Sequence, residues 1–246
     1  MIFSIRNFLI CLFFLSACFS DKTFFHFFKK ESCEKKIKNF YKASREIFLD
    51  KAKTCLKENK PKQAVIILEH LLQRDKIQEV NFEQQKELTK ELANKSFYYL
   101  KNYRKALKYY TALLKMPLKP REKISIQHYK AKSFYYLKKH SQALKEIEKN
   151  LTKELSIEER KKALLLKAEI FIAQNQFDKA GHLFQNQIES FPDQEDFFRE
   201  NLAVIYESQK KFSMAIEELE KIEKPSSFVL KKIKRLKARK NNQPRF

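Results

Sequence analysis

The sequence of 246 residues contains a single glycine, Gly181, and no tryptophan. Strand-rich and α/β folds use glycine in turns that need a positive φ, so its scarcity favours helices joined by other kinds of turn. Phosphate-cradling loops of the Rossmann and P-loop types need several glycines. Those two kinds of nucleotide-binding site are therefore excluded.

Acidic residues are also few relative to basic ones: the chain has 30 acidic residues and 52 lysines and arginines, which gives a net charge of +22. Such an excess attracts acidic partners, which include nucleic acid, anionic lipid and acidic peptides. A lysine-rich and glycine-poor composition is also what an AT-rich coding sequence would give. Both interpretations of the charge stay open.

Patterns typical of catalytic and metal sites are missing. Neither H-E-x-x-H nor G-x-S-x-G occurs. The histidines stand singly at His26, His70, His128, His140 and His182. The neighbouring carboxylates Glu158 and Glu159 follow Ser156 in a capping-box pattern, where they stabilise the start of a helix. We therefore expect no enzyme activity, no cofactor and no metal ion.

The most informative stretch is a heptapeptide that occurs twice. Residues 95–101 and residues 132–138 both read Lys-Ser-Phe-Tyr-Tyr-Leu-Lys, 37 positions apart. An identical sequence at a period of roughly 20 to 50 residues indicates a stacked repeat protein. Nine residues after its phenylalanine, each copy is followed by an alanine, Ala106 or Ala143.

Alanines at similar spacing extend the pattern to five repeats, at Ala64, Ala106, Ala143, Ala180 and Ala215. Nine residues earlier stand Cys55, Phe97, Phe134, Phe171 and Tyr206. Twelve residues earlier stand Ala52, Asn94, Ala131, Ala168 and Ala203. Small residues that face large ones at fixed offsets let antiparallel helices pack closely, so we expect all three sets to face the core.

Over roughly residues 45–224 this pattern resembles the tetratricopeptide repeat (TPR) family, whose unit is a pair of antiparallel helices. The first repeat matches least well, because Cys55 and Pro61 stand where aromatic residues are usual, and the family's first-helix tryptophan is missing throughout. The resemblance implies an all-α fold, a right-handed superhelical solenoid of about five TPR-like antiparallel helix pairs with a C-terminal capping helix.

Prolines and the C-terminal pattern predict where helices begin and end. We expect a helix from about residue 32 to 59, another that opens at Pro61, and a break between repeats four and five at Pro192. From residue 229 onward the chain has eight lysines or arginines and no acid, with apolar residues on one helical face. This end is expected to be a capping helix whose charges are solvated or touch anionic lipid or nucleic acid.

The N-terminus resembles a bacterial lipoprotein signal. An apolar run at residues 8–15 leads directly into Leu15-Ser16-Ala17-Cys18, which matches the lipobox that is cut before an acylated cysteine. The chain is therefore expected to comprise a signal peptide at 1–17, a lipid-anchored tether at 18–40, a TPR-like repeat domain at 41–224 and a basic capping helix and tail at 225–246. Cys18 would carry the lipid.

After such processing Cys33 and Cys55 would remain, and an extracytoplasmic pair can form a disulfide. If one continuous helix joined them, their Cα atoms would lie about 33 Å apart. Cys55 also falls at a core position of the first repeat, where a buried thiol packs as a small hydrophobe. We expect the two cysteines to stay unpaired.

The resemblance to TPR proteins implies a peptide-binding groove lined by the first helix of each pair. Transferred by offset, the lining residues are Lys53, Lys57, Lys95, Tyr98, Tyr99, His128, Lys132, Tyr135 and Tyr136, followed by Glu169 in the fourth repeat. These residues predict a basic, tyrosine-rich strip suited to acidic or carboxylate-ended ligands. The alternative is that Tyr99 and Tyr136 fill helix packing and the lysines are solvated.

The function expected from these features is a membrane-anchored scaffold that binds protein or peptide partners in the bacterial cell envelope, on the extracytoplasmic side. In length, repeat number and anchor the layout resembles the TPR lipoprotein that takes part in outer-membrane β-barrel assembly. The alternative is a soluble regulatory or nucleic-acid-associated TPR protein that uses its basic surface, which requires the lipobox match at Cys18 to be false.

Overall fold

The computed structural model describes residues 44–77, 81–151 and 154–242. Those residues form 11 α-helices and one short 3-10 helix, with no strand among them, which confirms the all-α prediction. No helix in these ranges is long and apolar enough to cross a membrane. The expected signal peptide, Cys18, the whole of the expected tether and residues 32–43 of the expected first helix lie outside the described residues.

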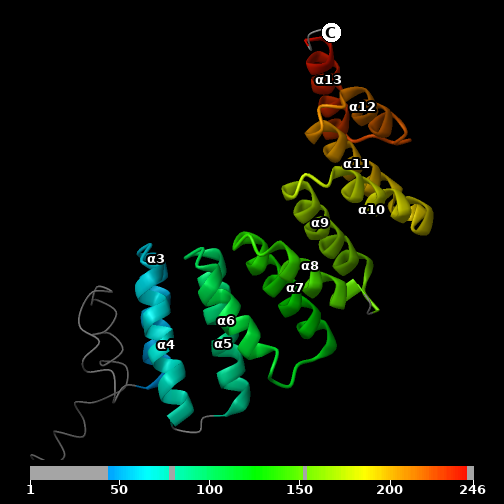
Figure 1. The fold of residues 1–246 in the computed structure, drawn as a ribbon. Helices are drawn as coiled ribbons and strands as arrows, with labels where there is room; N and C mark the ends of the chain where they lie inside the picture. The colour runs from blue at the N-terminus through cyan, green and yellow to red at the C-terminus, as the bar shows by residue number, and fades with distance from the viewer. Residues whose placement is uncertain (1–43, 78–80, 152–153, 243–246) are drawn as a thin grey trace, which may run out of the picture. The chain divides into compact units, whose positions relative to one another are not determined.

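The chain divides into two compact units, one up to Lys101 and one from Asn102 onward. The described helices of the N-terminal unit are α3 (Arg45–Lys57), α4 (Pro61–Ile77) and α5 (Phe82–Tyr98). Those of the C-terminal unit are α6 (Tyr103–Leu113), α7 (Pro120–Tyr136), α8 (His140–Leu151), α9 (Ile157–Ala173), α10 (Phe177–Ser190), the 3-10 helix η2 (Pro192–Gln194), α11 (Glu195–Ser208), α12 (Phe212–Glu220) and α13 (Ser227–Asn241) (Figure 1).

Consecutive helices pack against one another within each unit, α3 on α4 and α4 on α5 in the first, and α6 through α13 in order in the second. Repeats one, three, four and five are therefore the packed pairs α3/α4, α7/α8, α9/α10 and α11/α12, and the second repeat supplies α5 and α6. The two helices of the second repeat belong to different compact units. The period read from the heptapeptide is confirmed as a period of helix pairs.

The five repeat alanines are all fully buried, as predicted. The residues twelve positions earlier are buried in four repeats, and the exception is Asn94 in α5, which is half-buried. The expectation that Asn94 packs in the core is wrong. Its amide carries donors and acceptors that need polar partners, and its neighbour Ala93 is fully buried in the same turn.

The turn inside each pair uses a left-handed residue in place of glycine. Over the described ranges, the non-glycine residues with positive φ are Asn59, Lys101, Lys138, Asn175 and Lys210, with φ between 48° and 60°. Each lies five positions before a repeat alanine. In the third repeat the N–H after this residue, that of Lys139, donates to the carbonyl of Phe134 at 2.9 Å, a helix-ending bond of the Schellman type. A chain with one glycine thus still makes five left-handed helix ends.

Helix starts follow the predicted signals. Pro61 begins α4, and Pro192 begins the 3-10 turn between repeats four and five. At the start of α9 the Ser156 N–H donates to Glu159 Oε2 at 2.9 Å, and the Glu159 N–H donates back to Ser156 Oγ at 3.4 Å. The expected helix from residue 32 to 59 is wrong in extent, because Ser44 is extended, with φ −68° and ψ 162°, and α3 begins only at Arg45.

Cys55 is fully buried in α3 and is disulfide-bonded. Its bonded partner lies outside the described residues, which contain no other cysteine. The expectation that Cys55 is a free thiol is therefore wrong. That expectation assumed one continuous helix from Cys33, and the extended backbone at Ser44 removes the assumption.

The C-terminal end of the array is closed as predicted. Helix α13 buries Val229, Ile233 and Leu236 in one hydrophobic cluster with residues of α11 and α12. The capping helix therefore covers apolar surface that the fifth repeat would otherwise expose.

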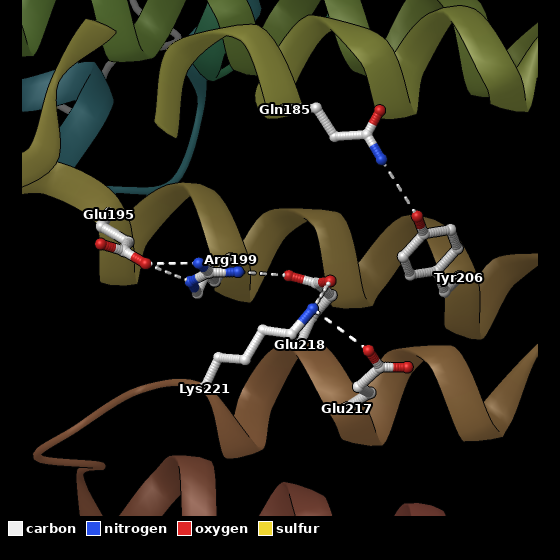
Figure 2. A network of polar contacts seen from close by, with 7 residues as sticks. All are labelled: Gln185, Glu195, Arg199, Tyr206, Glu217, Glu218 and Lys221. Atoms are coloured by element: carbon white, nitrogen blue, oxygen red, sulfur yellow. Dashed lines mark hydrogen bonds and ion pairs between the residues drawn. The ribbon is translucent and has the colours of Figure 1, made fainter. Parts of the chain in front are cut away.

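A polar network holds α11 to α12 (Figure 2). Arg199 Nη1 lies 2.7 Å from Glu218 Oε2, and the same guanidinium pairs with Glu195 one helical turn earlier. Lys221 Nζ approaches the other Glu218 oxygen at 2.8 Å. Arg199 and Glu218 are both largely buried. Removing either partner should destabilise the fold, because the remaining one would be a buried charge without compensation.

Candidate functional site

The residues predicted to line a groove fall into both compact units. Lys53, Lys57, Lys95, Tyr98 and Tyr99 belong to the N-terminal unit, and His128, Lys132, Tyr135 and Tyr136 to the C-terminal unit. Each group is described by itself.

In the C-terminal unit, α7 and α9 are the first helices of repeats three and four, and they contact one another. His128, Lys132 and Tyr135 recur on α7 at spacings of four and three, and Lys162 and Glu169 lie seven apart on α9, so each set shares one helical face. We call these five residues the α7–α9 surface. Three of the predicted lining residues and Glu169 are brought together here.

His128 shows how close the basic groups are. Its burial, reinforced by the positive charges of Lys132 and Lys162, lowers its pKa from 6.5 to about 4. The imidazole is therefore neutral at pH 7, and its ring meets Tyr129 edge-on with centroids 5.7 Å apart. At neutral pH the two lysines supply the positive charge of this surface.

Glu169 is exposed, yet crowding by protein atoms raises its pKa, with the charge of Lys132 acting in the opposite direction. Burial also raises the pKa of Tyr135, and Glu169 and Tyr136 add to that effect. Lys132, Tyr135 and Glu169 are therefore close enough to influence one another electrostatically across α7 and α9.

The charged groups of this surface have no close counter-ion. Among the described residues, none of Lys132, Lys162 and Glu169 has an ion-pair partner within 4.0 Å. By contrast the neighbouring Lys161 binds Glu158 at 3.1 Å, and Lys167 binds Glu148 at 3.3 Å. The charges without an ion-pair partner among the described residues are therefore those of the α7–α9 surface.

Tyr136 has a packing role. Its ring stacks on Tyr103 of α6 with centroids 4.5 Å apart and planes 20° from parallel, and a second stack joins Tyr110 to Tyr129 at 5.8 Å. These pairs hold α6 to α7. For Tyr136 the packing interpretation raised from the sequence is correct, although its ring remains partly exposed.

The N-terminal unit has a hollow of about 420 Å³ between α3 and α5. Its lining residues are Arg45, Leu49, Glu87, Leu88, Lys90, Glu91, Asn94, Lys95 and Tyr99. Lys95 and Tyr99 are therefore brought together as predicted, with the Lys95 ammonium 5.6 Å from the Tyr99 ring centroid. Lys53, Lys57 and Tyr98 are exposed and are not part of this lining.

The charges of this hollow are paired. Lys95 Nζ lies 3.2 Å from Glu91 Oε1, Lys90 Nζ lies 3.8 Å from Glu87 Oε1, and Arg45 pairs with the fully buried Asp75. The prediction of a basic strip does not hold in this unit. The groove positions transferred from the TPR family included the lysines but not the acidic residues one helical turn away. The i,i+4 spacing of Glu91 and Lys95 is the sequence signal for that pair.

Sequence reasoning also missed Lys162, although it stands seven residues before Glu169 on the same helical face. Over the ranges that the structure describes, no group of three or more metal-ligating side chains comes together.

No protein-family model matches the chain, and no curated protein matches it significantly. Solved structures do, at low identity. A TPR protein from Parabacteroides merdae ATCC 43184 is 18% identical, with a TM-score of 0.54, and the match covers 83% of this chain and 77% of that one. A Podosopora anserina protein with nearly identical TPR-like repeats is 16% identical, with a TM-score of 0.56 and coverages of 80% and 96%. MamA from Desulfovibrio magneticus RS-1 is 14% identical, with a TM-score of 0.51 and coverages of 80% and 97%.

These similarities show the class of fold: the chain has a TPR-like fold built of helix pairs. At such identities they carry no further information about what the protein binds.

Proposed function

We propose that this protein is an interaction scaffold that holds an extended acidic peptide segment of a partner protein on the α7–α9 surface. The observation that carries the proposal is that Lys132 and Lys162, which both act on His128, have no ion-pair partner among the described residues, with Tyr135 one turn from Lys132 on the same face of α7. Ammonium groups that no described carboxylate pairs with are available to the carboxylates of a ligand.

The other groups of the surface would shape selectivity. Tyr135 offers a flat, partly exposed ring that contacts a peptide at low entropic cost. Glu169 would accept a backbone N–H or a ligand cation and would repel an acid placed beside it. The favoured ligand therefore carries carboxylates opposite the lysines and an uncharged or basic group opposite Glu169.

The proposed location is the extracytoplasmic side of a bacterial membrane, with the protein anchored through a lipid on Cys18. The lipobox match supports it, and so does the disulfide at Cys55, because disulfides persist mainly in oxidising compartments. The layout resembles the TPR lipoprotein of the outer-membrane β-barrel assembly machinery, so assembly of such barrels is included among the proposed roles.

The binding proposal is tested by placing a photo-cross-linking amino acid at position 132 or 162 in intact cells. Position 145 on α8 is the control, since Lys145, which is exposed like Lys162, also lacks an ion-pair partner among the described residues. The proposal expects the same partner protein from positions 132 and 162 and none from 145. Cross-links that are equal at all three positions contradict it.

The location is tested separately by membrane fractionation of the wild type and of Cys18→Ser. An anchored protein stays with the membrane in high salt, and the variant is released. Recovery of the wild type with nucleic acid, in a salt-sensitive complex and with an unacylated N-terminus, would instead favour the nucleic-acid alternative.

A further inference from the structure

The capping helix α13 has a high density of basic residues. Between Ser227 and Asn241 it has seven lysines and arginines and no acidic residue. Its inner face is apolar and buried, as described above, so all of these charges lie on its flanks or on its outer face.

The flanking charges are neutralised by the neighbouring helices. Arg235 and Arg239 both bind Glu207 of α11, at 3.0 and 2.7 Å, and Lys237 Nζ lies 2.7 Å from Glu220 Oε1 of α12. These pairs fix the helix against the fifth repeat and remove three of the seven charges from consideration as ligand contacts.

The outer face keeps its charges and also exposes apolar groups. Lys231 and Lys234 are exposed, and neither has an ion-pair partner in the described part of the chain. Phe228 is 67% exposed, more than any other large hydrophobic side chain described, and Leu230 is 54% exposed. Lys231 and Lys234 are three residues apart on the side opposite the buried face, and Phe228 and Leu230 flank them, Phe228 three residues from Lys231 and Leu230 four residues from Lys234.

We propose that this outer face of α13 binds the surface of an anionic membrane. Phenylalanine and leucine beside lysines suit the lipid interface, where the apolar groups enter the acyl boundary and the ammonium groups meet phosphates. A nucleic acid would use the lysines and could stack on Phe228, but it offers nothing to Leu230. A lipid surface uses all four side chains.

The inference is independent of the α7–α9 surface. It would give the proposed lipid anchor a second membrane contact.

The test is co-sedimentation of the full chain, carrying Cys18→Ser, with phosphatidylcholine vesicles and with vesicles that also contain phosphatidylglycerol. The apolar N-terminal run can bind vesicles without anionic lipid. Binding to the phosphatidylcholine vesicles is therefore subtracted as background. The double variant Lys231→Glu/Lys234→Glu should weaken the anionic-lipid-dependent binding at least about 25-fold, from roughly fivefold per cation.

The matched control is Lys123→Glu/Lys145→Glu, which changes the net charge equally at exposed lysines of α7 and α8 that have no ion-pair partner among the described residues. It should weaken binding less than about threefold, through the general field alone. Phe228→Ser/Leu230→Ser should also lose most of the binding, whereas Ile66→Ser, at an exposed apolar site of the N-terminal unit, should lose none.

Circular dichroism confirms that each variant is folded. Three outcomes overturn the proposal. One is no dependence on anionic lipid, and another is an equal loss in the matched charge control. The third is loss on charge reversal with none on Phe228→Ser/Leu230→Ser, which would identify a general anion-binding face such as a nucleic-acid contact.

Discussion

Residues 95–101 and residues 132–138 are the same heptapeptide in two settings. Both copies end a first helix, α5 or α7, and both finish on a left-handed lysine, Lys101 with φ 48° and Lys138 with φ 60°. Their surroundings differ. The first lysine of one copy, Lys95, is paired with Glu91, whereas Lys132 has no ion-pair partner among the described residues and acts on His128 and Glu169.

The tyrosines differ in the same way. Tyr99 is 60% exposed beside Lys95, while its counterpart Tyr136 is stacked on Tyr103. The comparison shows that both copies reach a left-handed lysine, although α5 ends one heptapeptide position earlier, at Tyr98, than α7 does at Tyr136. The neighbouring residues and helices determine whether the side chains are packed, paired or available to a ligand. The following predictions contrast the two copies, from the largest expected effect to the smallest.

Replacing the phenylalanines with alanine should give the largest difference in stability between the two copies. Phe97 is buried, and Phe134 is partly buried at the edge of a cluster between α7, α8 and α9. Phe97→Ala should lower the free energy of unfolding by about 3 kcal/mol, and Phe134→Ala by about half as much. Urea unfolding followed by circular dichroism measures both. Equal losses would show that the surroundings do not distinguish the copies.

The serines should differ by about 1 kcal/mol. Both are fully buried, but the Ser133 hydroxyl donates to the Tyr129 carbonyl at 2.8 Å, whereas the Ser96 hydroxyl has no hydrogen-bond partner among the described residues. Ser133→Ala should therefore cost about 1 kcal/mol, and Ser96→Ala should be neutral or slightly stabilising. The same urea unfolding assay measures both losses. A larger loss of stability for Ser96→Ala than for Ser133→Ala would contradict the assigned hydrogen bonds.

The left-handed lysines should respond alike. Lys101→Gly and Lys138→Gly should each stabilise the protein by roughly 0.5 to 1 kcal/mol, because glycine adopts positive φ without steric cost. Lys145→Gly, inside α8, is the control and should destabilise by a similar amount. A loss of stability at either left-handed site would mean that its side chain contributes more than the backbone strain costs.

The smallest predicted effect is on the pKa of His128. Lys132→Gln should raise that pKa from about 4 by less than about one unit, since burial is the larger cause, and Lys95→Gln should leave it unchanged. The pKa in the fold is depressed below the ordinary 6.5, so the unfolded chain takes up the proton first. Stability from the neutral ring is present above about pH 6.5 and is lost as the pH falls towards 4. Titration of the histidine ring signals by NMR measures the shift.

Much of the fold could be predicted because it is periodic. The repeat alanines, the capping box at Ser156 and the buried face of α13 each follow from spacing along one helix or one pair. The left-handed turns were not foreseen, because lysine carries no preference for positive φ and only Asn59 and Asn175 are residues that often adopt it.

The site was less predictable for a physical reason. Offsets place Lys95 and Lys132 at equivalent positions, but the charge each presents depends on other residues, Glu91 in one case and Lys162 and Glu169 in the other. The disulfide at Cys55 depends on a second cysteine outside the described residues, and no local pattern reveals which cysteines pair.

The most direct test of the account is partner capture with matched double variants of the two copies. Lys132→Ala/Tyr135→Ala removes the ligand-facing groups proposed for the α7–α9 surface, and Lys95→Ala/Tyr98→Ala makes the same changes in the first copy. We predict that capture of the cross-linked partner falls about tenfold or more with the first pair and less than about twofold with the second, at unchanged helicity. Equal losses, or a larger loss with the first-copy variant, would contradict the assignment of the binding surface to α7 and α9.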